Sequence, residues 1–138
     1  MQGDENATVT LVEYGDYECP HCSAAYYVVK TVQNHYGHQL RFVFRHFPVS
    51  KIHPYTEPAA QASELAALYD RFWQMHDGIY ENQDRLNIPL PFEIGGESGL
   101  PADSIHHAIA NDEFLLEIQD DFLGGSRSGG GGTPAVLH

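Results

Sequence analysis

The short motif Cys19-Pro20-His21-Cys22 constrains the fold more than any other part of this 138-residue chain, because it holds both cysteines. Two thiols separated by two residues can close a small disulfide ring if a helix begins at or just after the first. The first thiol then lies beside the unpaired N–H groups and the positive end of the helix dipole, which stabilise a thiolate. Pro20 suits the first helical turn, and His21 can place a donor or a positive charge beside the sulfur. The motif therefore predicts a redox centre at the start of a helix.

The residues on either side of the motif predict a strand, a helix and a second strand. Residues 8–14 are β-branched and apolar over a length typical of a buried strand. Apolar residues recur at helical spacing from Pro20 to Tyr36, and Gly37 is a natural helix C-cap. Residues 39–47 alternate and are rich in Phe and Val, which predicts a second strand. This order favours a right-handed βαβ unit with parallel strands.

The middle of the chain has a different character and predicts helices. The alanine- and leucine-rich stretch from Thr56 to Leu68 predicts a helix capped by Thr56, and aromatic residues continue the helical pattern to Tyr80. Residues 86–99 contain two prolines and three glycines, so we expect a loop there.

The last third of the chain predicts two short helices and a short strand. The helices are expected at residues 101–110 and 112–123, with Gly124 and Gly125 ending the second. After a stretch of Gly and Ser, residues 135–137 have the composition of a strand.

The composition excludes several classes of protein. Hydrophobic residues make up 42% and charged residues 19% of the sequence, which indicates one globular domain. A net charge of −12 argues against binding to nucleic acid or to anionic membrane. Because no apolar run approaches the ~20 residues of a membrane span, membrane insertion is not expected. Without a visible leader the chain as it stands predicts a cytoplasmic protein, whereas a removed leader would place it in the cell envelope.

The segment from Val12 to Cys22 resembles the active-site segment of the DsbA-like thioredoxin-fold oxidoreductases. The likeness continues through residues 41–48 and 53–84 and fades between residues 86 and 122. It returns at residues 127–134, where the family keeps a cis-proline loop. The resemblance implies an α/β, thioredoxin-like fold with a helical insertion.

The resemblance also implies a division of the chain. Residues 1–49 and 124–138 would form the thioredoxin-like domain, and residues 50–123 the helical insertion. The family continues past the cis-proline with a β-hairpin and a final helix, whereas this chain stops at His138. We therefore expect these C-terminal elements to be missing, which would leave a sheet edge open for self-association.

Roles for individual residues follow from the resemblance. Cys19 would be the exposed nucleophile and Cys22 the buried resolving thiol. Glu13 matches a buried acid that could accept the proton of Cys22, although on sequence alone it could equally face solvent at a strand edge. Pro134 would be the cis-proline beside the disulfide, with Thr133 offering its backbone to an extended substrate peptide. Pro20 and His21 would tune the Cys19 thiol.

These roles imply a thiol–disulfide oxidoreductase that acts on protein or peptide dithiols and disulfides and needs an unidentified redox partner. No cofactor is expected. A stabilised Cys19 thiolate favours the oxidising direction, whereas Asp16 and Glu18 oppose it by placing negative charge nearby.

Two other classes of protein stay open. One is a catalytically silent thioredoxin-fold fragment that serves in binding or assembly. The other is a zinc-binding structural module, in which His46 and His53 would join the two cysteines.

Overall fold

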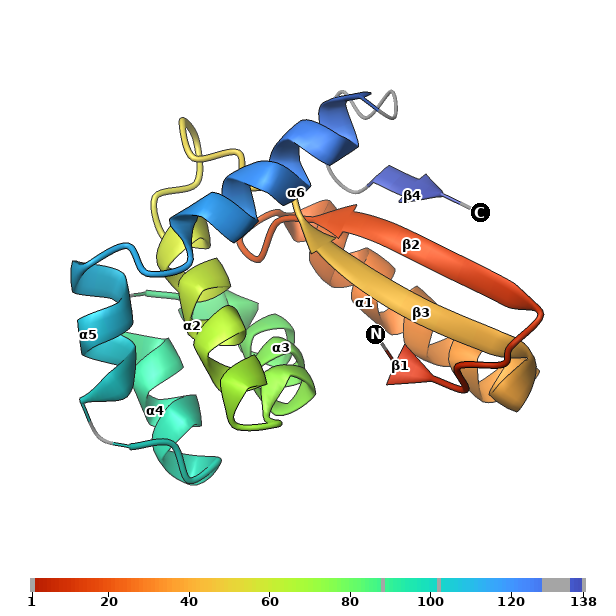
Figure 1. Cartoon of the computed structure of the whole chain (residues 1–138), viewed down its shortest axis with the longest axis horizontal. Helices are drawn as coiled ribbons and strands as arrows, with labels where there is room; N and C mark the ends of the chain where they lie inside the picture. Colours follow the sequence, from red (N-terminus) through yellow and green to blue (C-terminus); the bar gives the residue numbers. More distant parts are fainter. Residues whose placement is uncertain (1, 88, 102, 128–134, 138) are drawn as a thin grey trace.

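A computed structural model describes residues 2–87, 89–101, 103–127 and 135–137 of the chain. These residues form a four-stranded sheet in the order β1-β3-β2-β4 and a group of helices beside it (Figure 1). Helix α1 (Pro20–Tyr36) runs behind the sheet, and α6 (Leu115–Arg127) crosses its upper end. The α/β, thioredoxin-like fold that the sequence predicts is confirmed.

The predicted βαβ unit forms the centre of the sheet. Strand β2 (Val9–Gly15), helix α1 and strand β3 (Leu40–His46) follow one another, with a short 3-10 turn, η1 (Gly37–Gln39), before β3. The two strands pair in parallel from Val9↔Leu40 to Gly15↔His46. Gly37 ends α1 with a φ of 54°, a conformation that glycine adopts without steric cost.

Two short strands flank this pair in antiparallel orientation. The sequence analysis did not predict β1 (Gln2–Gly3), which pairs with β3. It did predict the strand at residues 135–137, and β4 (Ala135–Leu137) pairs with β2. Strand β2 is therefore a central strand between β3 and β4. Self-association through the edge at β4 stays a prediction.

A group of helices lies to one side of the sheet (Figure 1). Helix α2 packs against α3 and α5, and α4 packs against α3. The predicted helices at 56–68 and up to Tyr80 are confirmed, with α2 starting at Thr56 and its N-cap one residue earlier at Tyr55. The bounds are α2 (Thr56–Leu68), α3 (Phe72–Glu81), the 3-10 turn η2 (Gln83–Arg85), α4 (Pro89–Glu97) and α5 (Ser104–Ala110).

The loop predicted at residues 86–99 is wrong, because most of it forms α4. Both prolines fall in the first turn of this helix, where a missing N–H costs little. The Asn87 side chain also accepts a hydrogen bond from the Leu90 N–H at 2.9 Å. Gly95 is buried against α5, and a Cβ there would clash with Ile105 Cδ1. The two prolines therefore belong to the start of α4, and Gly95 allows close contact between α4 and α5.

The prediction that Gly124 and Gly125 end the last helix is also wrong. Helix α6 begins at Leu115 and runs through both glycines to Arg127. A Cβ on Gly125 would lie 2.7 Å from the Phe47 ring and 2.8 Å from the Tyr14 ring, so glycine lets the helix approach the sheet closely. This packing outweighs the cost of about 1 kcal/mol for glycine inside a helix.

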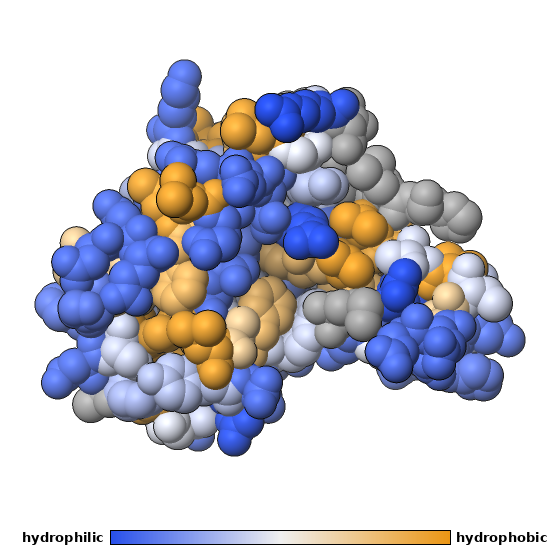
Figure 2. Space-filling view, viewed as in Figure 1, coloured by the Kyte–Doolittle hydropathy of each residue, from blue (hydrophilic) through white to orange (hydrophobic). Residues whose placement is uncertain are grey.

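Helix α6 packs mainly on β3 and spans the expected boundary at residue 123. The division into residues 1–49 with 124–138 and residues 50–123 stays a prediction. Among the described helices, none combines the length and apolar character needed to span a bilayer. The face shown in Figure 2 is mostly hydrophilic, with separate hydrophobic patches.

Candidate active site

The turn between β2 and α1 brings Cys19 to the start of the helix. Its N–H donates to the Asp16 carbonyl at 3.2 Å, and its own carbonyl accepts hydrogen bonds from the N–H groups of Cys22 (3.1 Å) and Ser23 (3.2 Å). Cys19 is thus the N-cap of α1, and Pro20 is the first helical residue. The predicted helix start at the cysteine motif is confirmed.

Both cysteines are buried. Cys22 is fully enclosed, and its Sγ accepts a hydrogen bond from the Asp16 N–H at 3.4 Å. Cys19 is only 6% exposed, so the expectation of an exposed thiol is wrong. It packs in the same apolar cluster as Tyr80 and Cys22, and the Gln83 side chain lies against its carbonyl. The two cysteines are not joined by a disulfide, and the intervening Pro20 and His21 are exposed.

Glu13 is buried in the central strand β2, so the alternative in which it faces solvent at a strand edge is wrong. Its Oε2 atom has no hydrogen-bond partner among the described residues. Burial raises the pKa of its carboxyl from 4.5 to about 7. A Cβ on Gly15 would lie 2.8 Å from Glu13 Oε2, and the next residue, Asp16, donates to Cys22. Glu13 and Cys22 therefore lie at the same end of β2.

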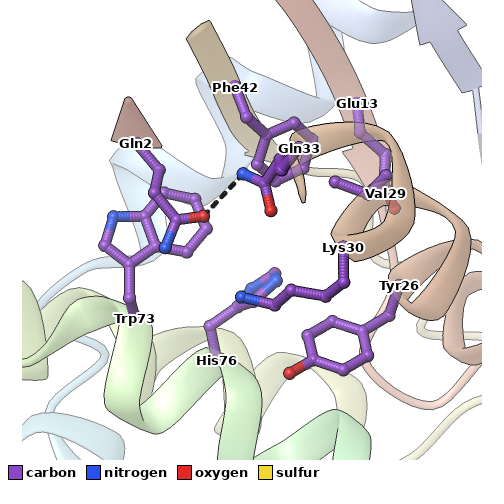
Figure 3. A pocket seen from close by; sticks show the side chains of 9 residues that line it. All are labelled: Gln2, Glu13, Tyr26, Val29, Lys30, Gln33, Phe42, Trp73 and His76. Carbon is purple, nitrogen blue, oxygen red and sulfur yellow. Dashed lines mark hydrogen bonds between the residues drawn. The ribbon is translucent and has the colours of Figure 1, made fainter. Parts of the chain in front are cut away.

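A small cavity of about 10 Å³ borders Glu13 between the sheet, α1 and α3 (Figure 3). Such a volume holds about one water molecule. The side chains of Lys30 and His76 extend toward each other beside it. Burial, and then the positive charges of Lys30 and His46, hold the pKa of His76 well below its usual range. The cavity is lined by Gln2, Glu13, Tyr26, Val29, Lys30, Gln33, Phe42, Trp73 and His76.

Asp16 has the opposite environment to Glu13. Its carboxylate is buried and accepts three hydrogen bonds: from the N–H of Glu18 at 2.8 Å, the N–H of Val49 at 2.7 Å and the His53 ring at 2.9 Å. These bonds fasten the loop after β3 to the turn before Cys19. The sequence analysis had treated Asp16 only as a charge near the thiol.

A further contribution that the sequence analysis missed comes from the helical group. Side chains of His76, Tyr80 and Gln83 hydrogen-bond residues 16–19 of the turn. The spacing of four and three residues is the signal that could have found them, because it puts three polar side chains on one helical face. Tyr80 lies close to both Glu13 and Cys22, whose charges add to burial in raising its pKa.

The two histidines considered as zinc ligands each contact a carboxylate. His46 Nε2 lies 2.6 Å from Glu64 Oε1, and His53 Nδ1 lies 2.9 Å from Asp16 Oδ2. Within the described part of the chain, no group of three or more Cys, His, Asp and Glu residues is placed to hold a metal ion. The predicted substrate-site residues Thr133 and Pro134 lie outside the described residues.

The match to known families agrees with this geometry. The family model described as thioredoxin matches residues 1–137. The chain belongs to the thioredoxin family. Within that family its fold is DsbA-like. This thioredoxin-family chain superposes on BdbD from Bacillus subtilis with a TM-score of 0.87 at 21% identity, covering 98% of this chain and 78% of BdbD. It matches the thiol–disulfide exchange protein alpha-DsbA2 from Wolbachia pipientis with a TM-score of 0.83 at 22% identity, covering 99% of this chain and 73% of alpha-DsbA2.

Curated relatives of higher sequence identity are much longer proteins. The thioredoxin-family chain is 46% identical over 123 residues to a protein of Mycolicibacterium gilvum named Na⁺/H⁺ antiporter NhaA 1. The match covers 88% of this chain and 20% of that relative. The chain thus spans about a fifth of the length of the curated relatives it matches.

Proposed function

We propose that this chain catalyses thiol–disulfide exchange on protein or peptide substrates, with Cys19 as the nucleophile and Cys22 as the resolving thiol. The placement of Cys19 at the N-cap of α1, one turn before the enclosed Cys22, carries this proposal. A thiolate at a helix N-terminus is stabilised by the orphan N–H groups and the helix dipole. Substrates would approach beside the exposed Pro20 and His21, and Thr133 and Pro134 would complete the peptide site.

In the oxidising direction the enzyme starts with a Cys19–Cys22 disulfide. A substrate thiolate attacks Cys19 Sγ, a mixed disulfide forms, and Cys22 leaves as a thiolate. A second substrate thiolate then attacks the substrate sulfur of the mixed disulfide and releases the Cys19 thiolate. Two electrons pass from the substrate dithiol to the enzyme, and a disulfide of the redox partner restores the starting state. The same steps in reverse reduce a substrate disulfide.

Glu13 would exchange a proton with Cys22 during these steps. A carboxyl with a pKa of about 7 is partly protonated at neutral pH, so it can give a proton to the departing Cys22 thiolate or take one from the thiol. The adjacent cavity offers space for one water between such a carboxyl and the outside.

The oxidising direction is supported by the place of Cys19 at the N-cap of α1, because the helix N-terminus stabilises the thiolate of the reduced enzyme. The three donors to Asp16 stabilise its charged form, and this negative charge acts in the opposite direction. The equilibrium constant of the Cys19–Cys22 couple against glutathione measures this direction.

Activity assays with cysteine variants test the proposal. We expect the oxidised chain to oxidise a dithiol peptide, Cys19→Ser to abolish the reaction, and Cys22→Ser to accumulate a mixed disulfide at Cys19. Cys19 should also be alkylated at a lower pH than a free thiol requires. Activity that survives Cys19→Ser, or an ordinary thiol profile at Cys19, would contradict the mechanism.

A second candidate function is supported by the curated relatives named Na⁺/H⁺ antiporters, in which the matched region makes up about a fifth of the length. In this case the chain would bind a membrane transporter, either as a redox catalyst for its thiols or as a catalytically silent module. Capture from detergent-solubilised membranes separates the two. A mixed disulfide formed only by Cys22→Ser indicates catalysis, and association that Cys19→Ser retains indicates a binding module.

A further inference from the structure

The redox turn is held by side chains that lie more than fifty residues further along the chain. His76 Nδ1 lies 3.0 Å from the Tyr17 hydroxyl, and the Tyr80 hydroxyl donates to the Asp16 carbonyl at 3.2 Å. Gln83, in the 3-10 turn η2, contacts the part of the turn nearest the thiol. Its Nε2 donates to the Tyr17 carbonyl at 2.9 Å and to the Cys19 carbonyl at 2.8 Å.

We propose that Gln83 is a positioning residue for Cys19, in a role that builds on the proposed thiol–disulfide exchange. Its amide carries two hydrogens, and the two carbonyls it binds lie on either side of Glu18. One side chain therefore fixes the backbone on both sides of the last residue before the nucleophile. Both of these carbonyls belong to the backbone, so Gln83 acts through the backbone of Cys19.

The Cys19 carbonyl is the point at which α1 is anchored. It accepts the N–H groups of Cys22 and Ser23 as well as the Gln83 amide. Cysteine is not among the residues whose side chains usually cap helices. Gln83 thus supplies, from another element, a contact that holds the N-cap residue in its extended conformation, with φ −73° and ψ 123°.

Positioning of this kind affects reactivity as well as stability. Stabilisation of a thiolate by a helix N-terminus falls off within one turn, so it depends on where the N-cap residue sits. Small displacements of a reacting group also slow its reactions strongly. Loss of the Gln83 contacts should therefore weaken the reactivity of Cys19 in a chain that stays folded.

The test compares Gln83→Met, which keeps the side-chain length without the donors, with Asn82→Ala as a matched control. Asn82 precedes Gln83, and its amide donates to the Gly78 carbonyl instead of the turn. Iodoacetamide alkylation of Cys19 is followed against pH in the reduced full-length chain, with the site located by mass spectrometry. We expect Gln83→Met to react roughly five- to tenfold more slowly at neutral pH, with its profile moved to higher pH. Asn82→Ala should stay within about twofold of the parent chain.

Gln83→Glu sharpens the comparison, because an ionised carboxylate offers no donor and faces two carbonyls. It should lose more reactivity at pH 8 than Gln83→Met. If Gln83→Met reacts at Cys19 as the parent chain does, the amide is only structural and the proposal is overturned. The proposed function fails in a different way, if the parent chain shows no thiol–disulfide exchange that depends on Cys19. The alkylation rates would still test the role of Gln83 in that case.

A measurement on the parent chain covers the case in which a variant does not fold. The two side-chain amide hydrogens of Gln83 are expected to be protected from solvent exchange in NMR spectra. Their resonances should shift when Cys19 and Cys22 form a disulfide, because the N-cap carbonyl then moves with the sulfur. Resonances that show neither protection nor response to oxidation would also overturn the proposal.

Discussion

Glu13 and Asp16 are two buried acids three residues apart at the same end of β2, yet their surroundings differ completely. The Asp16 carboxylate accepts three hydrogen bonds. Glu13 Oε2 has no partner among the described residues and borders a cavity the size of one water. Burial raises the pKa of the Glu13 carboxyl to about 7.

The difference shows that burial alone does not decide what an acid does. A buried carboxylate with several donors is stabilised in its charged form and serves to hold structure. One that lacks donors is destabilised in its charged form and can exchange protons near neutral pH. We therefore assign Asp16 to the architecture of the turn and propose Glu13 for proton transfer.

The largest effect should come from the ionisation of Glu13. Because burial raises its pKa from 4.5 to about 7, the folded state binds more protons than the unfolded state between these pH values. The free energy of unfolding therefore falls as the pH rises through this range, by about 3 kcal/mol in all, and stays lower above it. Glu13→Gln should reduce the difference in stability between pH 4 and pH 8 by this amount, as measured by urea unfolding at each pH.

Glu117→Gln, on the exposed side of α6, is the matched control and should leave the pH dependence unchanged. Asp77 and Asp121, whose pKa values burial also raises, should keep part of the pH dependence in both variants. An identical pH dependence in Glu13→Gln and the parent chain would show that Glu13 does not titrate differently on folding.

A smaller effect is expected at Asp16. Asp16→Asn places an amide NH₂ where the carboxylate met three donors, so at least one donor loses its partner. The free energy of unfolding should fall by about 2 kcal/mol at pH 7.5. Asp4→Asn is the control, because Asp4 also accepts a backbone hydrogen bond, from Asn6, but at an exposed position. Equal losses in the two variants would remove the contrast between Asp16 and Glu13.

The smallest effect is expected at His53, which supplies one of the three donors to Asp16. His53→Ala should lower the free energy of unfolding by about 1 kcal/mol, because the two backbone donors remain. His38→Ala, at an exposed position, is the control. The double variant His53→Ala with Asp16→Asn measures the coupling between these two residues. Fully additive losses would mean that His53 stabilises the loop without acting through Asp16.

Local sequence patterns were sufficient for the centre of the fold. β-Branched and apolar residues predicted β2, and alternating apolar residues predicted β3. Apolar residues at helical spacing, with a proline at the start and a glycine at the end, predicted α1. The cysteine motif also predicted the helix start at Cys19. These features depend on residues that are close in sequence, so a pattern can report them.

The remaining features depend on contacts between distant residues. Gly95 and Gly125 resemble helix breakers, but each lies where a side chain of another element leaves no room for a Cβ. The burial of Cys19 could not be predicted, because it belongs to a core cluster whose other members include distant residues of α3. The pairing of Asp16 with His53 likewise joins residues 37 positions apart, and no local pattern indicates it.

The face formed by His76, Tyr80 and Gln83 also limits how the chain length can change. Each residue added to a helix rotates all later side chains by about 100° and moves them about 1.5 Å along the axis. A single insertion or deletion between His76 and Gln83 would therefore turn Gln83 away from Cys19 while His76 still faced Tyr17. Length changes after Arg85 leave these three side chains in register with the turn and act instead on the packing of α4.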